Sequence, residues 1–134
     1  MSRRKPGLPK SSDLVLSDLQ LMLMRVFWSR PSATAADVVA ELRPIRPLAH
    51  TTVATLLSRL EKRGLLVATR EGRQVTYSAA VSRRDVRRSM VSALLAGLFD
   101  GEARGLVSHL VDQRHIGAKE LAEIRAALAR KDPS

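Results

Sequence analysis

Apolar residues recur at helical spacing along the first third of the chain. The first run predicts a helix that begins after Ser17, which can form a capping box with Gln20, and that ends before Pro31. Its apolar positions are Leu19, Met22, Leu23, Val26 and Phe27. A second helix is predicted with Thr34 as its N-terminal cap and with apolar positions Val38, Val39 and Leu42. Two prolines then make residues 43–47 a connector, because proline breaks a helix.

A third helix is predicted from His50 or Thr51 to Arg63, with Gly64 as its C-terminal cap. Its two faces differ in character. One face is an apolar stripe of Val53, Leu56, Leu57 and Leu60. The other is a polar stripe, at spacing i, i+3, i+7 and i+10, of Thr52, Thr55, Arg59 and Lys62. Every side chain of the polar stripe can donate a hydrogen bond.

After Gly64 the apolar period changes from that of a helix to that of a strand. Residues 65–70 and 74–78 are predicted to be short strands, joined by the turn signal Glu71-Gly72-Arg73. The predicted order is therefore three helices followed by a two-stranded hairpin with a basic tip, which carries Arg70 and Arg73. The fold class that this order indicates is mostly α with a small β-hairpin.

Three more amphipathic helices are predicted after Ser82, the second of them bounded by Gly101/Gly105 and Gly117. Three short helices over about 50 residues bury little core alone, so they should pack against another surface. The simplest such surface is a second copy of the same region, which predicts a homodimer. The residues assigned to its interface are Leu94, Leu98, Leu106, Leu110, Leu121, Ile124 and Leu128.

The charge balance favours a polyanionic partner. The chain has 23 Lys and Arg against 13 Asp and Glu, a formal net charge of +10. Nucleic acid is the first expectation and an acidic membrane surface the second. Residues 1–80 carry 13 of the basic and 6 of the acidic side chains, so a polyanion is expected to dock there. No apolar run approaches the roughly 18 residues of a membrane span, which predicts a soluble, cytoplasmic protein without membrane insertion.

The residue types argue against catalysis and against a cofactor. The chain has no cysteine, which excludes disulfides, thiolate catalysis and Cys-based zinc sites. No nucleophile stands in a pattern with a base, and no Gly-rich phosphate loop is present. His109, Asp112 and His115 could suggest a metal site, but their spacing swings His115 away from the other two. A surface or interface role is the favoured interpretation, and neither metal nor enzyme activity is predicted.

The third predicted helix has the character of a DNA-reading helix. The major groove accepts an α-helix and displays a distinct donor and acceptor pattern for each base pair. A helix that reads it needs one face anchored in the core and one face of short polar donors with an Arg or Lys, and residues 50–63 have both. The basic hairpin tip would reach neighbouring phosphates or the minor groove.

A resemblance to a known family rests on these same segments. The run Thr51-Thr-Val-Ala-Thr-Leu-Leu-Ser-Arg-Leu-Glu-Lys-Arg-Gly64, followed by Arg70-Glu-Gly-Arg73 and Tyr77, closely resembles the penicillinase-repressor family. That family includes the methicillin-resistance regulator and copper-responsive repressors. Residues 16–28 also resemble its first helix, and residues 106–128 its dimerisation segment. The resemblance covers residues 13–130 and is strongest across 50–77.

The resemblance implies a winged helix-turn-helix domain over residues 13–80 and a helical dimerisation domain over 81–134. It further implies a homodimer that binds an inverted-repeat operator in double-stranded DNA and blocks transcription. On the matching positions it implies contacts to bases, or to the DNA backbone nearby, from His50, Thr51, Thr52 and Thr55. Contacts to the DNA backbone are implied for Arg59, Lys62, Arg70 and Arg73. Ala54 stands where some relatives have Arg, so the resemblance implies the mode of DNA binding but not the operator sequence.

The resemblance also bears on induction. In the best-studied relatives, release from DNA follows cleavage of the dimerisation domain in a cascade that begins at a membrane-bound sensor, so a regulatory protease is a candidate partner. The family's scissile Asn-Phe pair falls on His109 and Leu110, so the pair itself is not retained. The copper-responsive branch senses metal through cysteines, which this chain lacks.

Several features have two interpretations. Residues 1–12 are predicted to be a flexible basic arm, either a solubilising tail or a contact to nucleic acid. A basic cluster after the hairpin has two interpretations, contact with the DNA backbone or a solvated face, and the solvated face is favoured. Its members are Arg83, Arg84, Arg87 and Arg88. Trp28 is expected to be a core or interdomain anchor rather than a stacking platform. The alternative for the whole chain is a non-catalytic adaptor that binds protein or nucleic acid without sequence specificity.

Overall fold

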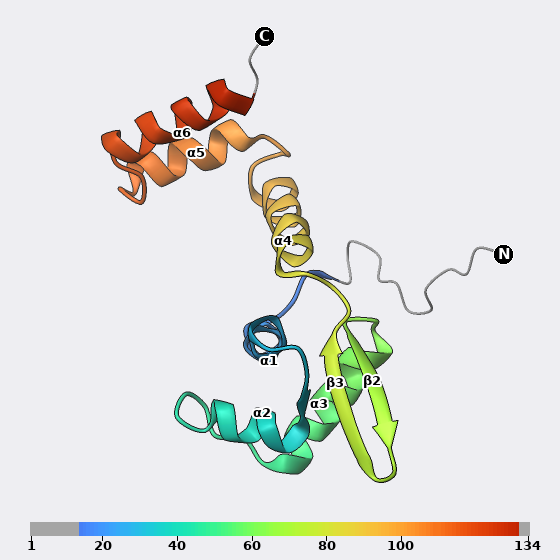
Figure 1. Cartoon of the computed structure of the whole chain (residues 1–134). Helices are drawn as coiled ribbons and strands as arrows, with labels where there is room; N and C mark the ends of the chain where they lie inside the picture. Colours follow the sequence, from blue (N-terminus) through green and yellow to red (C-terminus); the bar gives the residue numbers. More distant parts are fainter. Residues whose placement is uncertain (1–13, 132–134) are drawn as a thin grey trace, which may run out of the picture. The chain divides into compact units, whose positions relative to one another are not determined.

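The computed structural model describes residues 14–131, in nine helices and strands (Figure 1). The predicted basic arm, residues 1–12, lies outside the described residues. The chain divides into two compact units after Ala93. The division therefore falls inside the helix that follows the hairpin, whereas the sequence placed it before this helix. The reason is that Val86, in the second turn of the helix, is buried with the core of the first unit.

The first unit begins with three helices, α1 (Asp18–Ser29), α2 (Ala35–Leu42) and α3 (His50–Lys62). The predicted capping box of α1 is confirmed, because the Gln20 amide donates to Ser17 Oγ over 3.2 Å and the Ser17 amide donates to Gln20 Oε1 over 2.8 Å. Thr34 caps α2 in the same way, with Asp37 as its partner. Each box satisfies backbone donors that a helix start leaves free.

The end of α3 is set by Gly64, as predicted. This glycine has φ 84°, a left-handed conformation that costs glycine little. The Gly64 amide donates to the Glu61 carbonyl and the Leu65 amide to the Leu60 carbonyl, both over 2.9 Å. This pair of bonds is a Schellman motif, and it turns the chain so that Leu65 enters the core.

The hairpin belongs to a three-stranded antiparallel sheet with the order β1-β3-β2. Its strands are β1 (Ala33–Thr34), β2 (Leu66–Glu71) and β3 (Gln74–Ala79). The sequence predicted two strands, because a pair of residues such as β1 leaves no periodic signal and pairs only through tertiary contact. The turn is also shorter than predicted, since Glu71 pairs with Gln74 and leaves only Gly72 and Arg73 between the strands.

The core of the first unit is aliphatic, and no polar or charged residue is buried within residues 14–131. Its fully buried side chains include Leu23, Met24, Val38, Val53, Leu57, Leu60, Leu65 and Val86. Trp28 packs against this core and donates its indole N–H to the Val81 carbonyl over 3.0 Å, which fits the predicted anchoring role. Arg30 links α1 to α2 through ion pairs with Asp37 and Glu41.

The remaining helices are α4 (Arg83–Leu98), α5 (Ala103–Asp112) and α6 (Ala118–Lys131). The last two contain no buried residue. Gly105, expected to bound α5, lies inside it and packs against Phe99, which stands 3.0 Å from the position of a Cβ. Over residues 14–131, no helix is long and apolar enough to cross a membrane.

Candidate nucleic-acid interface

The outer face of α3 gathers most of the side chains predicted to read DNA. Thr51, Thr52, Thr55 and Arg59 are exposed and line one shallow hollow of about 280 Å³ together with half-buried Leu56. The opposite face of the helix is fixed, because Val53, Leu57 and Leu60 are buried in the core. Helical periodicity therefore presents this face to solvent as one surface.

The charge along α3 is polarised. Arg59 and Lys62 lie in its last turn, and its first turn has no acidic residue. Ala49, at the N-cap position, provides no side-chain hydrogen bond, so the first amides of α3 have no side-chain cap. Amides left free at a helix start, together with the positive end of the helix dipole, favour an anion.

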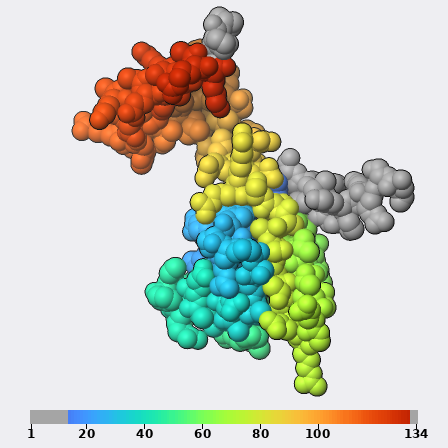
Figure 2. Space-filling view, viewed as in Figure 1, coloured from blue at the N-terminus to red at the C-terminus, as the bar shows by residue number. Residues whose placement is uncertain are grey.

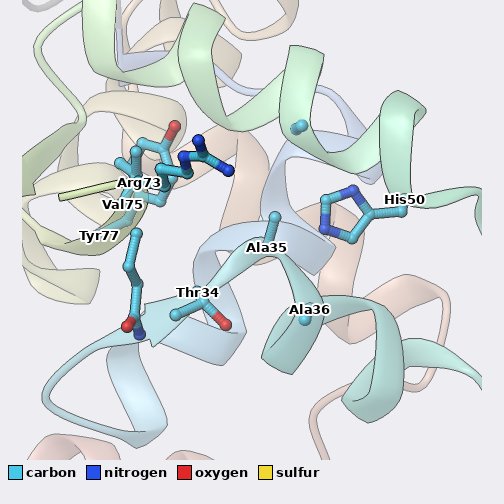
Figure 3. Close-up of a pocket in the computed structure, with 9 residues that line it drawn as sticks. Thr34, Ala35, Ala36, His50, Arg73, Val75 and Tyr77 are labelled. Carbon is cyan, nitrogen blue, oxygen red and sulfur yellow. The ribbon is translucent and has the colours of Figure 1, made fainter. Parts of the chain in front are cut away.

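His50 lies apart from the threonine hollow. It lines a larger pocket of about 420 Å³ between the start of α3, the start of α2 and the hairpin. Figure 3 shows His50 on one side of this pocket and Arg73, Val75 and Tyr77 on the other. Ala54 also lines the pocket, where it contributes only a methyl group.

Other residues around this pocket were not predicted as site residues. Thr34 was predicted only as a helix cap, and Ala35, Ala36 and Gln74 carried no functional signal. They reach the pocket because β1 pairs with β3, which brings the start of α2 beside the hairpin. No local pattern in the sequence reports this pairing.

The hairpin projects from the surface of its unit, as Figure 2 shows in yellow-green. Arg73 occupies the tip beside Gly72, whose φ of 62° allows the tight turn. Arg73 is exposed and makes no ion pair within residues 14–131. The Arg73 guanidinium is therefore available to bind an anion.

Arg70 is placed differently from Arg73. It lies in β2 opposite Val75, and its guanidinium is 3.6 Å from a carboxylate oxygen of Glu61. Burial raises the pKa of the neighbouring Tyr77 hydroxyl, the charge of Glu61 raises it further, and Arg70 opposes both. Tyr77 is therefore neutral at physiological pH. The carboxylate of Glu61 already balances part of the charge of Arg70.

Four of the seven residues assigned to dimerisation are exposed, on α4 and α6. Leu94, Leu98, Ile124 and Leu128 are exposed by 41%, 74%, 52% and 64%, and Leu106, Leu110 and Leu121 are half-buried. His109 lies near Phe99, with ring centroids 6.2 Å apart. In the described part of the chain, no three His, Asp or Glu residues group as a metal site would require, and this includes His109, Asp112 and His115.

Comparison with known proteins identifies the family to which the sequence is similar. A family model described as penicillinase repressor matches residues 16–130. Transcriptional regulator BlaI of Mycobacterium tuberculosis is 35% identical over 116 residues, which cover 85% of this chain and 83% of BlaI. The penicillinase repressor of Staphylococcus aureus is 24% identical over 106 residues, which cover 79% of this chain and 84% of that protein.

A solved structure supports the fold as well. The structure of a complex of hsRosR-S4 matches with a TM-score of 0.52 at 17% identity, over 88% of this chain and 97% of that one. The family model and the identity to BlaI each cover most of the chain. The chain therefore belongs to the penicillinase repressor family of DNA-binding transcriptional repressors, and its first unit is a winged helix-turn-helix.

Proposed function

We propose that the protein represses transcription as a homodimer bound to an inverted-repeat operator. In this proposal α3 of each protomer enters the major groove and the hairpin tip contacts the DNA backbone beside it. The observation that carries the proposal is the exposed face of α3, where Thr51, Thr52, Thr55 and Arg59 lie together above a buried apolar stripe.

The side chains on this face favour base reading over a general attraction to polyanions. A threonine hydroxyl donates and accepts hydrogen bonds, and its methyl group can contact the methyl group of thymine. A surface for any polyanion would carry Lys or Arg at positions 51, 52 and 55. We therefore assign base contacts to Thr51, Thr52 and Thr55.

Backbone contacts are assigned to the charged residues around this face. Arg59 and Lys62 lie in the last turn of α3, and Arg73 lies at the hairpin tip. His50 faces Arg73 across their shared pocket, so a DNA phosphate could be held between the two side chains and the free amides of α3. Arg70 contributes less, because Glu61 already pairs with it.

The homodimer is supported by the apolar side chains that α4, α5 and α6 leave exposed. A dimer that covers them carries two copies of α3, which meet successive major grooves about 34–36 Å apart. Twofold symmetry of the protein then requires a pseudo-palindromic operator.

The decisive experiment is a titration of the full chain against duplex DNA from upstream of its own gene, beside a shuffled duplex, across a salt series. We expect a preference of about a thousandfold or more, with two protomers per site. Equal and steeply salt-dependent binding to both duplexes would be followed by selection from a random duplex library. If that selection also yielded no preferred sequence, the adaptor without sequence specificity would be the better function.

Cleavage by a regulatory protease would require part of α5 to unfold. The His109–Leu110 peptide lies inside α5, where the His109 carbonyl accepts from the Gln113 amide over 2.9 Å and the Leu110 carbonyl from the His115 amide over 2.8 Å. A protease needs this segment extended, so we expect cleavage only after α5 unfolds locally. Limited proteolysis with mass spectrometry checks this: rapid cutting at position 109 in a chain with full α-helical content would contradict it.

A further inference from the structure

A pocket of about 370 Å³ lies between α1 and α4 in the first unit. Leu21, Arg25 and Trp28 line it from one face of α1, at spacing i, i+4 and i+7. Residues of α4 at spacing i, i+3, i+4 and i+7 line the other side, and they are Arg83, Val86, Arg87 and Met90. None of these residues belongs to the DNA-binding face described above.

The lining combines an apolar floor, made by Leu21, Trp28, Val86 and Met90, with three arginines and no acidic residue. Arg25, Arg83 and Arg87 make no ion pair within residues 14–131. The guanidinium of Arg83 stands over the Trp28 ring, 5.5 Å from its centroid, and the indole is held in turn by its bond to Val81. Three like charges around one hollow repel one another unless an anion lies between them.

We propose that this pocket binds a small organic anion, a carboxylate carried on a compact apolar body. The carboxylate accepts hydrogen bonds from Arg25 and Arg87, whose planar guanidiniums suit this group. The apolar body packs against Trp28, Val86 and Met90. The volume lies near the lower end of the range of about 300–1,000 Å³ for ligand pockets, which favours a small ligand.

A DNA phosphate fits this pocket less well than an organic anion does. The apolar floor offers nothing to a hydrated phosphate diester. The pocket also lies far from the hairpin tip, because the six residues of β3, about 20 Å of strand, separate the tip from the segment that leads to Arg83. The pocket therefore serves a ligand other than the operator, and its binding can be measured without DNA.

Phenylacetate is a suitable probe, since it joins a carboxylate to a compact aromatic ring. Trp28 is the only tryptophan of the chain, so its fluorescence reports on this pocket directly. We expect phenylacetate to change the Trp28 emission of the full chain saturably. Phenylacetamide has the same shape without the charge, and acetate has the charge without the ring, so each should bind at least about tenfold more weakly. Equal binding of phenylacetate and phenylacetamide would overturn the proposal.

Variants of α1 and α4 provide the matched test. Arg25→Gln with Arg87→Gln should weaken phenylacetate binding by about tenfold or more. Arg84→Gln with Arg88→Gln removes the same charge from α4 residues that do not line the pocket, and it should change the affinity less than about twofold. Equal losses from the two pairs would mean a general electrostatic effect and refute the site.

The same variants separate the organic anion from DNA as the occupant. If Arg25→Gln with Arg87→Gln leaves phenylacetate binding intact but lowers the salt dependence of binding to any duplex, the arginines serve the DNA backbone and the proposal is wrong. If phenylacetate binds as expected while no operator is found, the pocket stands and the proposed DNA role fails.

Discussion

Single side chains of α3 and of the hairpin are expected to act on DNA in different ways. Thr55 is held on a helix face that the core orients, so its hydroxyl can distinguish one base edge from another. Arg73 stands on a turn at the hairpin tip, where it can meet any phosphate of the backbone. In the proposed complex, the same protein surface thus combines residues that read sequence with residues that add affinity.

Thr55→Ala should lower the affinity for the operator by about 1–3 kcal/mol and relax the base preference at one operator position. The reason is that a base-edge hydrogen bond is lost while phosphate contacts remain. Titration against a panel of single-base operator variants measures both effects. Ser92→Ala, an exposed change on α4, is the control and should leave the panel unchanged.

Arg73→Ala should weaken binding to all duplexes about equally and lower the salt slope by roughly one ion. The exposed guanidinium carries no ion pair within the described residues, so its removal costs the free protein little. Arg84→Ala removes an equal charge beyond the far end of β3 and serves as the control. A change in base preference without a change in salt slope would contradict this division between α3 and the hairpin.

The sequence predicted which residues of α3 are exposed, but not that His50 and Arg73 share a pocket. The exposed positions of Thr51, Thr52, Thr55 and Arg59 follow from the helical period alone, because the apolar stripe fixes which side faces the core. The pocket shared by His50 and Arg73 could not be predicted, since it depends on how α2, α3 and the hairpin pack.

At the scale of helices and strands, short local signals set most boundaries. The capping box at Ser17, the cap at Thr34 and the glycine after α3 depend only on neighbouring residues, so the sequence located them correctly, although it did not predict that Asp37 completes a box with Thr34. Strand β1 depends on a partner more than 40 residues away, since Ala33 pairs with Tyr77, and no local pattern predicts it. The turn at the hairpin tip depends on Gly72, which adopts a left-handed conformation.

Gly72→Ala should destabilise the first unit by about 1 kcal/mol, because a left-handed conformation costs an L-residue roughly 1–2 kcal/mol and reduced freedom of the unfolded chain returns part of it. Apart from Gly72 and its two chain neighbours, no atom lies within 4 Å of the position of the new Cβ, so a steric clash adds nothing to this cost. Denaturant unfolding followed by Trp28 fluorescence measures it. Gly72→Asn, which tolerates this conformation better, should lose less; equal losses would point to a cause other than φ.

At the scale of the whole molecule, the proposed homodimer depends on α5 and α6, which would link two DNA-binding units. The two helices contain no buried residue, and they carry five of the seven side chains assigned to the dimer interface; the other two, Leu94 and Leu98, lie on α4. An operator with two half-sites is bound tightly only if the two units are linked, because the second half-site is then bound at a high effective concentration.

Leu110→Asp should give a monomer at micromolar concentration and weaken operator binding sharply, because a charge in an apolar interface is desolvated without a partner. Analytical ultracentrifugation and the operator titration measure the two effects. Ser108→Asp introduces the same charge at an exposed polar position of α5 and should preserve the dimer. A Leu110→Asp chain that remained dimeric would remove this residue from the interface.

The lack of buried residues in α5 and α6 also has a consequence for the amount of protein in a cell. If these helices gain their core only from a second copy, their folding obeys mass action and their melting temperature rises with protein concentration. A newly made chain at low copy number then has a folded DNA-binding unit and a C-terminal segment open to proteolysis. Repression would begin only above a threshold number of molecules, so the abundance of the protein would itself be a regulatory signal.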